Sequence, residues 1–183
     1  MKTAPFISLL STSELAALGP GPRPGVKSLA TLQEAVDAGL DEAQVEGKKA
    51  DLIRATIYLW HDHLDAAHEL AQEVENRDGS YVHAIMHRRE PDYGNAKYWF
   101  QRVGQHACYA KLAVEAGKVL KQAALDRLEA QLMPRGQWDA FGFVDACEEE
   151  SDSSDASRGS ALREVQRVEF EVLLSFLVSG VAG

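Results

Sequence analysis

Apolar residues recur at helical spacing along most of this chain, and short runs of Gly, Pro, Asp and Asn separate the periodic segments. Between positions 64 and 74 the apolar residues follow one another at intervals of three and four, which places them on one face of a helix. No segment keeps the alternation of apolar and polar residues that is typical of a half-buried strand. The sequence therefore predicts an all-α fold of about seven or eight helices.

Capping residues and helix breakers predict where these helices begin and end. A capping box of Ser11 and Glu14 predicts a short first helix, and Ser28 is expected to cap a second helix that runs through Val36. Asp92, which follows a proline, is expected to cap the helix predicted over 93–103. The remaining predicted helices cover 48–60, 64–74, 80–89, 93–103, 107–131, 137–148 and 159–179.

Two segments are predicted to be irregular. Residues 19–27 include GPGPRPG, in which prolines at alternate positions remove backbone donors and favour an extended connector. Residues 148–159 are polar and acidic with almost no apolar group to anchor them, so a mobile loop is expected there. The whole chain, 1–183, is predicted to be one helical domain.

Residues 50–104 contain an internal repeat whose matched positions are 29 residues apart. Ala55 and Ala67 in the first copy correspond to Ala84 and Ala96 in the second, and small residues there let two helices approach closely. The repeat resembles the tetratricopeptide-type helical hairpin, although its offset is shorter than about 34 and the hallmark Trp and Pro are missing. That resemblance implies two stacked antiparallel helix pairs, whose first helices line a groove for peptide ligands.

The block HAIMHRREPDYGNAKYWF, residues 83–100, contains the densest group of chemically active side chains. Together with WHDHLDAAHELAQ upstream and WDAFGFVDACE downstream, it is similar to a family of uncharacterised bacterial proteins. The similarity extends over most of the chain. It implies a complete domain and no particular activity.

The histidines in and near this block are candidate metal ligands. His83 and His87 share one face of a predicted helix, and Glu90 continues that face. Such a stripe could bind zinc, manganese or iron if another element supplied further ligands, which makes a divalent metal a candidate cofactor. The alternatives are hydrogen-bonded packing between helices and general acid–base work. The candidate metal ligands are His68, His83, His87, Glu90, Asp92 and His106. His61 and His63 flank Asp62, and a helix cap at Asp62 is the simpler interpretation of that segment.

A second candidate site combines cations with aromatic rings. The forks of Arg88 and Arg89 suit a carboxylate or phosphate, and neighbouring rings could stack on a ligand. An internal salt-bridge network with Glu90 and Asp92 is the alternative. The candidate ligand-binding residues are Arg88, Arg89, Tyr93, Asn95, Lys97, Tyr98 and Trp99.

Composition and charge narrow the class of partner. The net charge is −9, with 28 acidic against 19 basic residues, which disfavours nucleic acid. The N-terminus reads poorly as a signal peptide, and the apolar tail at 170–182 is shorter than the about 20 residues that a membrane span needs. A bacterial cytoplasmic protein without a membrane partner is therefore expected. The sequence has no GxSxG motif, phosphate-binding loop or dinucleotide fingerprint.

Three functions remain open from the sequence. The first is a noncatalytic helical-repeat protein that binds a peptide, a protein or a small acidic ligand through residues 81–102. The second is a metal-dependent or acid–base enzyme, hydrolase-like, built on His83, His87 and Glu90. The third is a structural protein that forms a homodimer through apolar residues of its C-terminal helix, namely Leu162, Val165, Val168, Val172, Leu173, Phe176 and Leu177.

Overall fold

The computed structural model describes residues 2–151 and 155–180, and every regular element in these residues is helical. This confirms the all-α class, with more helices than the seven or eight expected. Over these two described ranges, ten α-helices and one 3₁₀ helix follow in this order: α1 (Ala4–Ser8), α2 (Leu29–Ala43), α3 (Lys48–Trp60), α4 (Leu64–Gln72), α5 (Arg77–Arg89), α6 (Tyr93–Val103), α7 (Tyr109–Gln122), α8 (Asp126–Leu132), η1 (Pro134–Gly136), α9 (Ala140–Ser151) and α10 (Ala156–Ser179).

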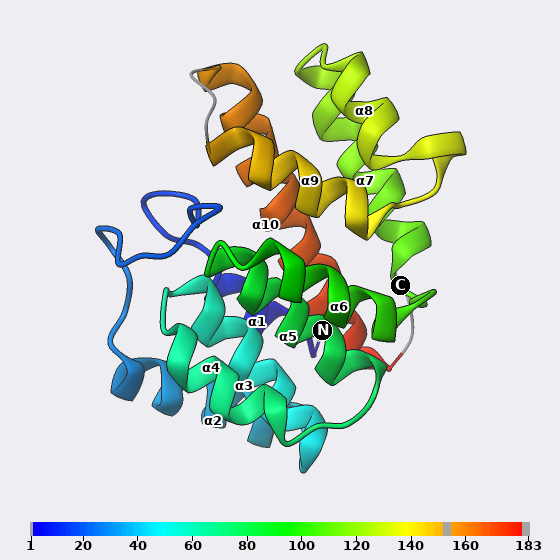
Figure 1. Cartoon of the computed structure of the whole chain (residues 1–183). Coiled ribbons are helices and arrows are strands. Elements are labelled where there is room, and N and C mark those ends of the chain that lie inside the picture. Colours follow the sequence, from blue (N-terminus) through cyan, green and yellow to red (C-terminus); the bar gives the residue numbers. More distant parts are fainter. Residues whose placement is uncertain (1, 152–154, 181–183) are drawn as a thin grey trace.

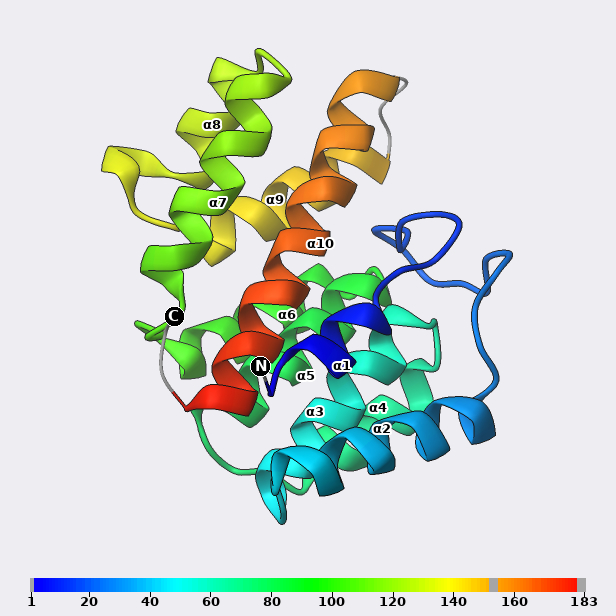
Figure 2. The same ribbon diagram turned by 180° about the vertical axis from the view of Figure 1, so that it is seen from behind.

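The helices form two groups that share α10 (Figure 1). Helices α1 to α6 make the larger group, while α7, α8 and α9 make the smaller one, in which α7 and α9 pack on α10. Figure 2 shows α10 running from one group to the other, with α1 and α7 beside it. The buried side chains of both groups belong to one hydrophobic core. The two groups therefore meet on the long last helix and through the packing of α6 against α9.

Two helix hairpins occupy the middle of the larger group. Helix α3 packs on α4 and α5 packs on α6, and the two hairpins touch through α4 and α5. The four repeated alanines, Ala55, Ala67, Ala84 and Ala96, are all completely buried, as expected where helices approach closely. The stacking of these hairpins in the tetratricopeptide manner stays a prediction.

Several predicted helix ends agree with the structure. Helices α3 and α6 begin and end where the sequence placed them. The side chain of Ser28 accepts a hydrogen bond from the backbone N–H of Thr31, and that of Asp92 accepts one from Asn95, so both act as the N-caps expected. Helix α2 is longer than predicted and ends at Ala43.

The first predicted helix is wrong. Residues 11–18 are irregular, and the chain forms the short helix α1 before them instead. The backbone carbonyls of Ala16 and Ala17 accept hydrogen bonds from the Gln166 side chain, and Ala17 also accepts one from Arg89. Because buried side chains from distant helices satisfy these carbonyls, the segment does not need helical hydrogen bonds.

The helix predicted over 107–131 is divided into α7 and α8. Ala124 adopts the left-handed conformation with φ of 55°, which ends the first of these helices. The helix predicted from position 137 begins later, at Ala140. The carboxylate of Asp139 accepts hydrogen bonds from the backbone N–H groups of Phe141 and Gly142 and so fixes this start.

The acidic loop expected at 148–159 is largely helical. Helix α9 extends to residue 151 and α10 begins at residue 156, while residues 152–154 lie outside the described residues. The guanidinium of Arg158 pairs with Glu149 at 2.7 Å and with Glu150 at 3.0 Å. These ion pairs hold the end of α9 against the start of α10, which is why the acidic residues there are ordered in helices.

The apolar residues of α10 are covered by the chain itself. Those expected to face a second subunit are buried, apart from Phe176, which is partly buried and packs on the same core. These residues therefore pack within the chain, and a homodimer through α10 stays a prediction. None of the described helices combines the length and the apolar character that a membrane span requires.

Two buried ion pairs connect α5 to the rest of the fold. Arg88 lies 2.5 Å from the carboxylate of Glu169 in α10, and both side chains are completely buried. Tyr81 donates a further hydrogen bond to Glu169. Arg89 lies 2.7 Å from Asp62 in the turn after α3, and this carboxylate also pairs with Arg23 of the connector. The two arginines therefore fix α5 against α10, the connector and the α3–α4 turn.

Removing the carboxylate of Glu169 should strongly destabilise the protein. We expect Glu169→Ala to lower the free energy of unfolding by about 3–5 kcal/mol, because Arg88 would stay charged, buried and without its partner. Urea denaturation followed by circular dichroism measures this change. The matched control on the same helix is Glu164→Ala, which breaks a partly exposed pair with Arg167 and should cost less than about 1 kcal/mol. Equal losses in the two variants would contradict the structural role of Glu169.

Candidate metal centre

Three imidazoles from two neighbouring helices converge in the described part of the chain. His68 lies in α4, and His83 and His87 lie one turn apart in α5. One possible ligand atom of each lies within 4.8 Å of the others. The helical spacing predicted that His83 and His87 share a face, and the packing of α4 against α5 brings His68 to them.

The start of α5 is held close to the end of α4. The Asn76 side chain caps α5 by accepting a hydrogen bond from the Gly79 N–H at 2.8 Å. A Cβ at Gly79 would lie only 1.9 Å from the carbonyl oxygen of Val74, so this close approach requires glycine. From Gly79 to the end of the helix every residue of α5 is buried, and packing therefore fixes the positions of His83 and His87.

The rings of the cluster stack in a column. His83 lies between the Trp99 indole of α6, at a centroid distance of 4.0 Å, and the His87 ring, at 5.0 Å. The planes differ by 13° and 11°, so the three rings are nearly parallel. The His68 ring meets the two other imidazoles edge-on, at 4.7 Å from His83 and 6.0 Å from His87.

Polar groups of the α5–α6 turn surround His87. Its Nδ1 lies 3.3 Å from a carboxylate oxygen of Glu90 and 4.0 Å from one of Asp92. The Asn95 side-chain nitrogen lies 3.1 Å from Nε2 of the same ring. The Glu90 and Asp92 side chains remain 38% and 54% exposed, so the carboxylates form the side of the cluster that reaches solvent.

The buried surroundings keep two of these histidines neutral. Burial, together with the neighbouring His87 and His68, lowers the pKa of His83 to about 4. Burial also lowers the pKa of His87, although Glu90 and Asp92 act in the opposite direction. Near neutral pH both rings therefore keep a nitrogen lone pair, which is the form that binds a metal ion.

The cluster fits a metal ion after a modest movement of the rings. Zinc at about 2.0–2.1 Å from each nitrogen in tetrahedral geometry would place the nitrogens about 3.4 Å apart. The spacing of up to 4.8 Å must therefore contract. The parallel rings of His83 and His87 must also tilt, because a bound metal lies close to the plane of each imidazole. His68 is only half-buried, which leaves its side chain room to rotate.

His106 takes no part in this cluster, so its prediction as a ligand is corrected. It lies before α7, where its ring nitrogens contact the carboxylate of Asp78 at 2.9 Å and the sulfur of Cys108 at 3.0 Å. His61 and His63 are likewise engaged elsewhere. Both hydrogen-bond to the backbone of Lys27, and so hold the connector against the α3–α4 turn.

The two arginines predicted to bind an anion lie inside the core. Arg88 and Arg89 are completely buried in the ion pairs with Glu169 and Asp62 described above, so the expected anion pocket is corrected to an internal network. The sequence suggested Glu90 and Asp92 as the acidic partners in such a network, whereas the observed partners are Glu169 and Asp62. A carboxylate at position 169, within the apolar stripe of the last helix, is the signal that could have revealed Arg88's partner.

The other predicted ligand-binding residues point to three different places. Asn95 and Trp99 lie at the histidine cluster. Tyr93 and Lys97 face α9, where the lysine pairs with Asp145 at 2.5 Å and the tyrosine hydroxyl donates to the carbonyl of Cys147. Tyr98 is 52% exposed at the surface beside Arg102. These residues therefore do not form one pocket.

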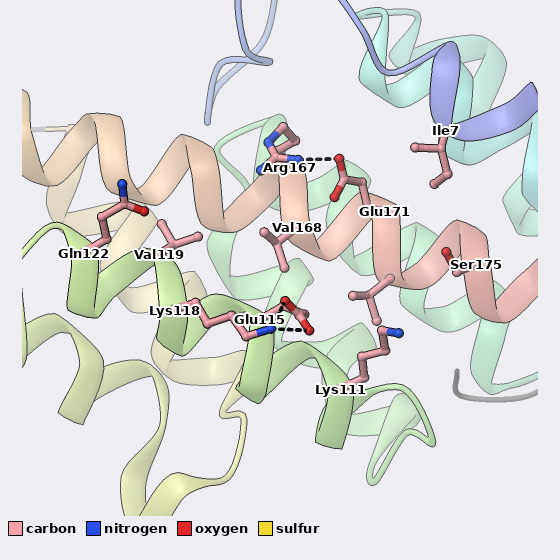
Figure 3. Close-up of a pocket in the computed structure, with 11 residues that line it drawn as sticks. Ile7, Lys111, Glu115, Lys118, Val119, Gln122, Arg167, Val168, Glu171 and Ser175 are labelled. Carbon is pink, nitrogen blue, oxygen red and sulfur yellow. Dashed lines mark hydrogen bonds and ion pairs between the residues drawn. The ribbon is translucent and has the colours of Figure 1, made fainter. Parts of the chain in front are cut away.

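A separate pocket of about 450 Å³ lies between α7 and α10 (Figure 3). Four of its five described charged side chains form ion pairs within their own helix, and Lys111 is the fifth. Glu115 pairs with Lys118 at 2.7 Å along α7, and Arg167 pairs with Glu171 along α10. Because these four charges are paired and the other described lining residues are mostly aliphatic or uncharged, the pocket offers no group of side chains comparable to the histidine cluster.

Comparisons with known proteins do not supply a function. No protein-family model, curated protein or solved structure matches this chain. The similarity of residues 83–100 to a bacterial family stays a prediction for the same reason. The functional argument therefore depends on the side chains and their geometry.

The low pKa of His83 predicts that the protein loses stability in mild acid. The pKa is about 4 in the folded protein and about 6.5 in the unfolded chain, so the unfolded chain binds more protons between these values. The free energy of unfolding should therefore fall as the pH falls from about 6.5 towards 4. Lowered pKa values of His61 and His87 act in the same direction.

Urea denaturation near pH 7 and near pH 5 tests this dependence. His83→Gln removes the titrating ring and should lose less stability over that interval than the unchanged chain. Proton NMR of the His83 ring should show a titration midpoint near 4 in the folded protein. A midpoint near the ordinary value of about 6.5 would contradict the prediction.

Proposed function

We propose that this protein binds one divalent transition-metal ion through His68, His83 and His87, and that the ion serves a hydrolase-like reaction. The observation that carries this proposal is the convergence of three imidazole ligand atoms within 4.8 Å, contributed by two packed helices. The low pKa values of His83 and His87 support it, because both rings are neutral and need not lose a proton to bind.

The type of ligand favours zinc, with iron and manganese as alternatives. Imidazole nitrogens suit zinc, iron, copper and nickel, whereas manganese prefers sites that also supply carboxylates. Glu90 is near enough to His87 to join the ligand set after a side-chain rotation, which would favour iron or manganese. Three histidines alone favour zinc with a fourth position left for water.

The carboxylates beside the cluster support a catalytic role over a purely structural one. A metal ion with three protein ligands keeps an open position and lowers the pKa of a bound water to about 7. Glu90 and Asp92 lie next to His87 and remain partly exposed. One of them can orient the His87 ring through its Nδ1, and the other can accept a proton from water. The reaction class proposed is therefore metal-assisted hydrolysis.

A peptide or small acidic ligand bound through residues 81–102 has less support. All three cations on which that idea depended have partners inside the chain: Arg88 with Glu169, Arg89 with Asp62 and Lys97 with Asp145. Recruiting Arg88 would leave the buried Glu169 carboxylate without its ion-pair partner, at a cost of about 3–5 kcal/mol. Recruiting Arg89 would remove one of the two arginines that pair with Asp62.

Metal binding is tested by titrating the full chain, purified without an affinity tag, with Co²⁺ and Zn²⁺. We expect one equivalent of Co²⁺ to produce visible absorption bands and one equivalent of Zn²⁺ to displace it. His68→Ala should weaken binding by more than about a hundredfold. It is the ligand substitution least expected to disturb folding, because His68 is half-buried.

The matched control is His63→Ala, which removes a half-buried histidine outside the cluster and should leave the affinity unchanged. Circular dichroism checks that both variants keep their helices. If His68→Ala and His63→Ala bound Co²⁺ as tightly as the unchanged chain, the proposed site would be wrong.

The open coordination position gives a second, separate prediction. Azide added to the Co²⁺-loaded protein should change its absorption bands, because an exogenous anion can replace the water at a site with three protein ligands. A fully occupied structural site would show no change. Bands that stay constant with saturating azide would therefore remove the catalytic part of the proposal while leaving metal binding intact.

A further inference from the structure

A second pocket, of about 410 Å³, lies between the end of α6, the start of α7 and the segment that leads into α9. It shares no residue with the histidine cluster. Four aromatic side chains line it, three of them buried and one, Phe141, 40% exposed. They are Phe100, Tyr109, Trp138 and Phe141.

Two of these aromatic residues keep a buried polar atom without a partner. Within the part of the chain that the structure describes, neither the Tyr109 hydroxyl nor the Trp138 Nε1 forms a hydrogen bond. Leaving such a group unsatisfied costs about 1–3 kcal/mol, and native proteins rarely do so without a reason. The Trp138 ring is held edge-on against Phe143 at 5.3 Å, so its position is fixed by packing. Both residues line the pocket, but the two donor atoms are closed off from solvent, so an acceptor from outside the chain reaches them only when a neighbouring side chain moves.

The polar side chains of the pocket have amide and carboxylate groups. The two hydrogen bonds that Asp139 accepts at the start of α9 both use Oδ1, which leaves Oδ2 without a bond among the described residues. Three glutamines, Gln101, Gln105 and Gln137, add groups that both donate and accept. Among the described residues that line the pocket there is no Lys or Arg. A phosphate or carboxylate would therefore meet Asp139 with no opposite charge.

We infer that this pocket binds an uncharged carbohydrate. Once a neighbouring side chain moves, a sugar hydroxyl can accept from Trp138 or Tyr109 and donate to Asp139, so one type of group satisfies both kinds of partner. The C–H faces of a sugar ring can pack on aromatic rings such as Phe141. An organic cation would suit the rings and Asp139, but it would leave the two buried donors unpaired. The inference does not depend on the metal proposal, because the two sites have no residue in common.

Two-dimensional NMR of the ¹⁵N-labelled full chain tests this inference through the indole N–H signal of Trp138. Loss of one indole signal in Trp138→Phe assigns it. The probes are the methyl glycosides of glucose, galactose and mannose, with tetramethylammonium chloride and sodium phosphate as charged contrasts. We expect at least one glycoside to shift the Trp138 signal in a saturable way and the two salts to leave it in place.

Two surface variants connect the shift to the pocket. Phe141→Ala should weaken the apparent affinity for that glycoside about tenfold, because the most exposed stacking ring is lost. Tyr98→Ala removes an exposed aromatic side chain outside the pocket and should leave the affinity unchanged. The inference is overturned if none of the three glycosides shifts the signal, if only a charged probe does, or if Phe141→Ala has no effect.

Discussion

The burial of two adjacent arginines on α5 is the constraint on which the rest of the structure depends. Moving an ion from water into a protein interior costs several kcal/mol, and only close, hydrogen-bonded partners offset that cost. Arg88 finds its carboxylate in α10, and Arg89 finds its own in the turn after α3, where Arg23 of the connector shares it. The backbone carbonyls of Ala17, Gly19 and Leu59 accept three more of the guanidinium hydrogens of Arg89. One turn of helix therefore orders segments from both ends of the chain.

The same turn of helix orients the histidine cluster. Residues 83 and 87 lie on one face of α5 because they are four positions apart. Residues 88 and 89 are rotated by about 100° and 200° from residue 87 around the helix axis. With the arginines held towards α10 and the α3–α4 turn, His83 and His87 face α4 and α6, where His68 and Trp99 lie. The buried charges thus do not bind a ligand themselves. They fix the rotation of the helix that presents the imidazoles.

The sequence predicted those parts of the fold that local signals determine. Helices α3 and α6 were placed correctly because glycine, aspartate and proline mark their ends, and the pairing of His83 with His87 follows from helical spacing alone. The irregular segment 11–18 was missed because a capping box competes there with hydrogen bonds from residues more than 70 positions away. The burial of Arg88 and Arg89 in internal ion pairs was missed for a similar reason. Arg88 and its partner Glu169 are 81 positions apart, and charges beside aromatic residues resemble a surface site until the tertiary contact is known.

In the proposed metal centre, burial both prepares the histidines for an ion and limits the directions from which a substrate can approach. It keeps His83 and His87 neutral and so prepares them for an ion, but it also closes the cluster on the side of Trp99, where the indole stacks on His83. The partly exposed carboxylates of Glu90 and Asp92 mark the side from which solvent reaches His87. A substrate for the proposed centre would therefore approach past these two acids. Because their negative charge repels anions, a neutral or cationic molecule is favoured over a phosphate ester at this entrance.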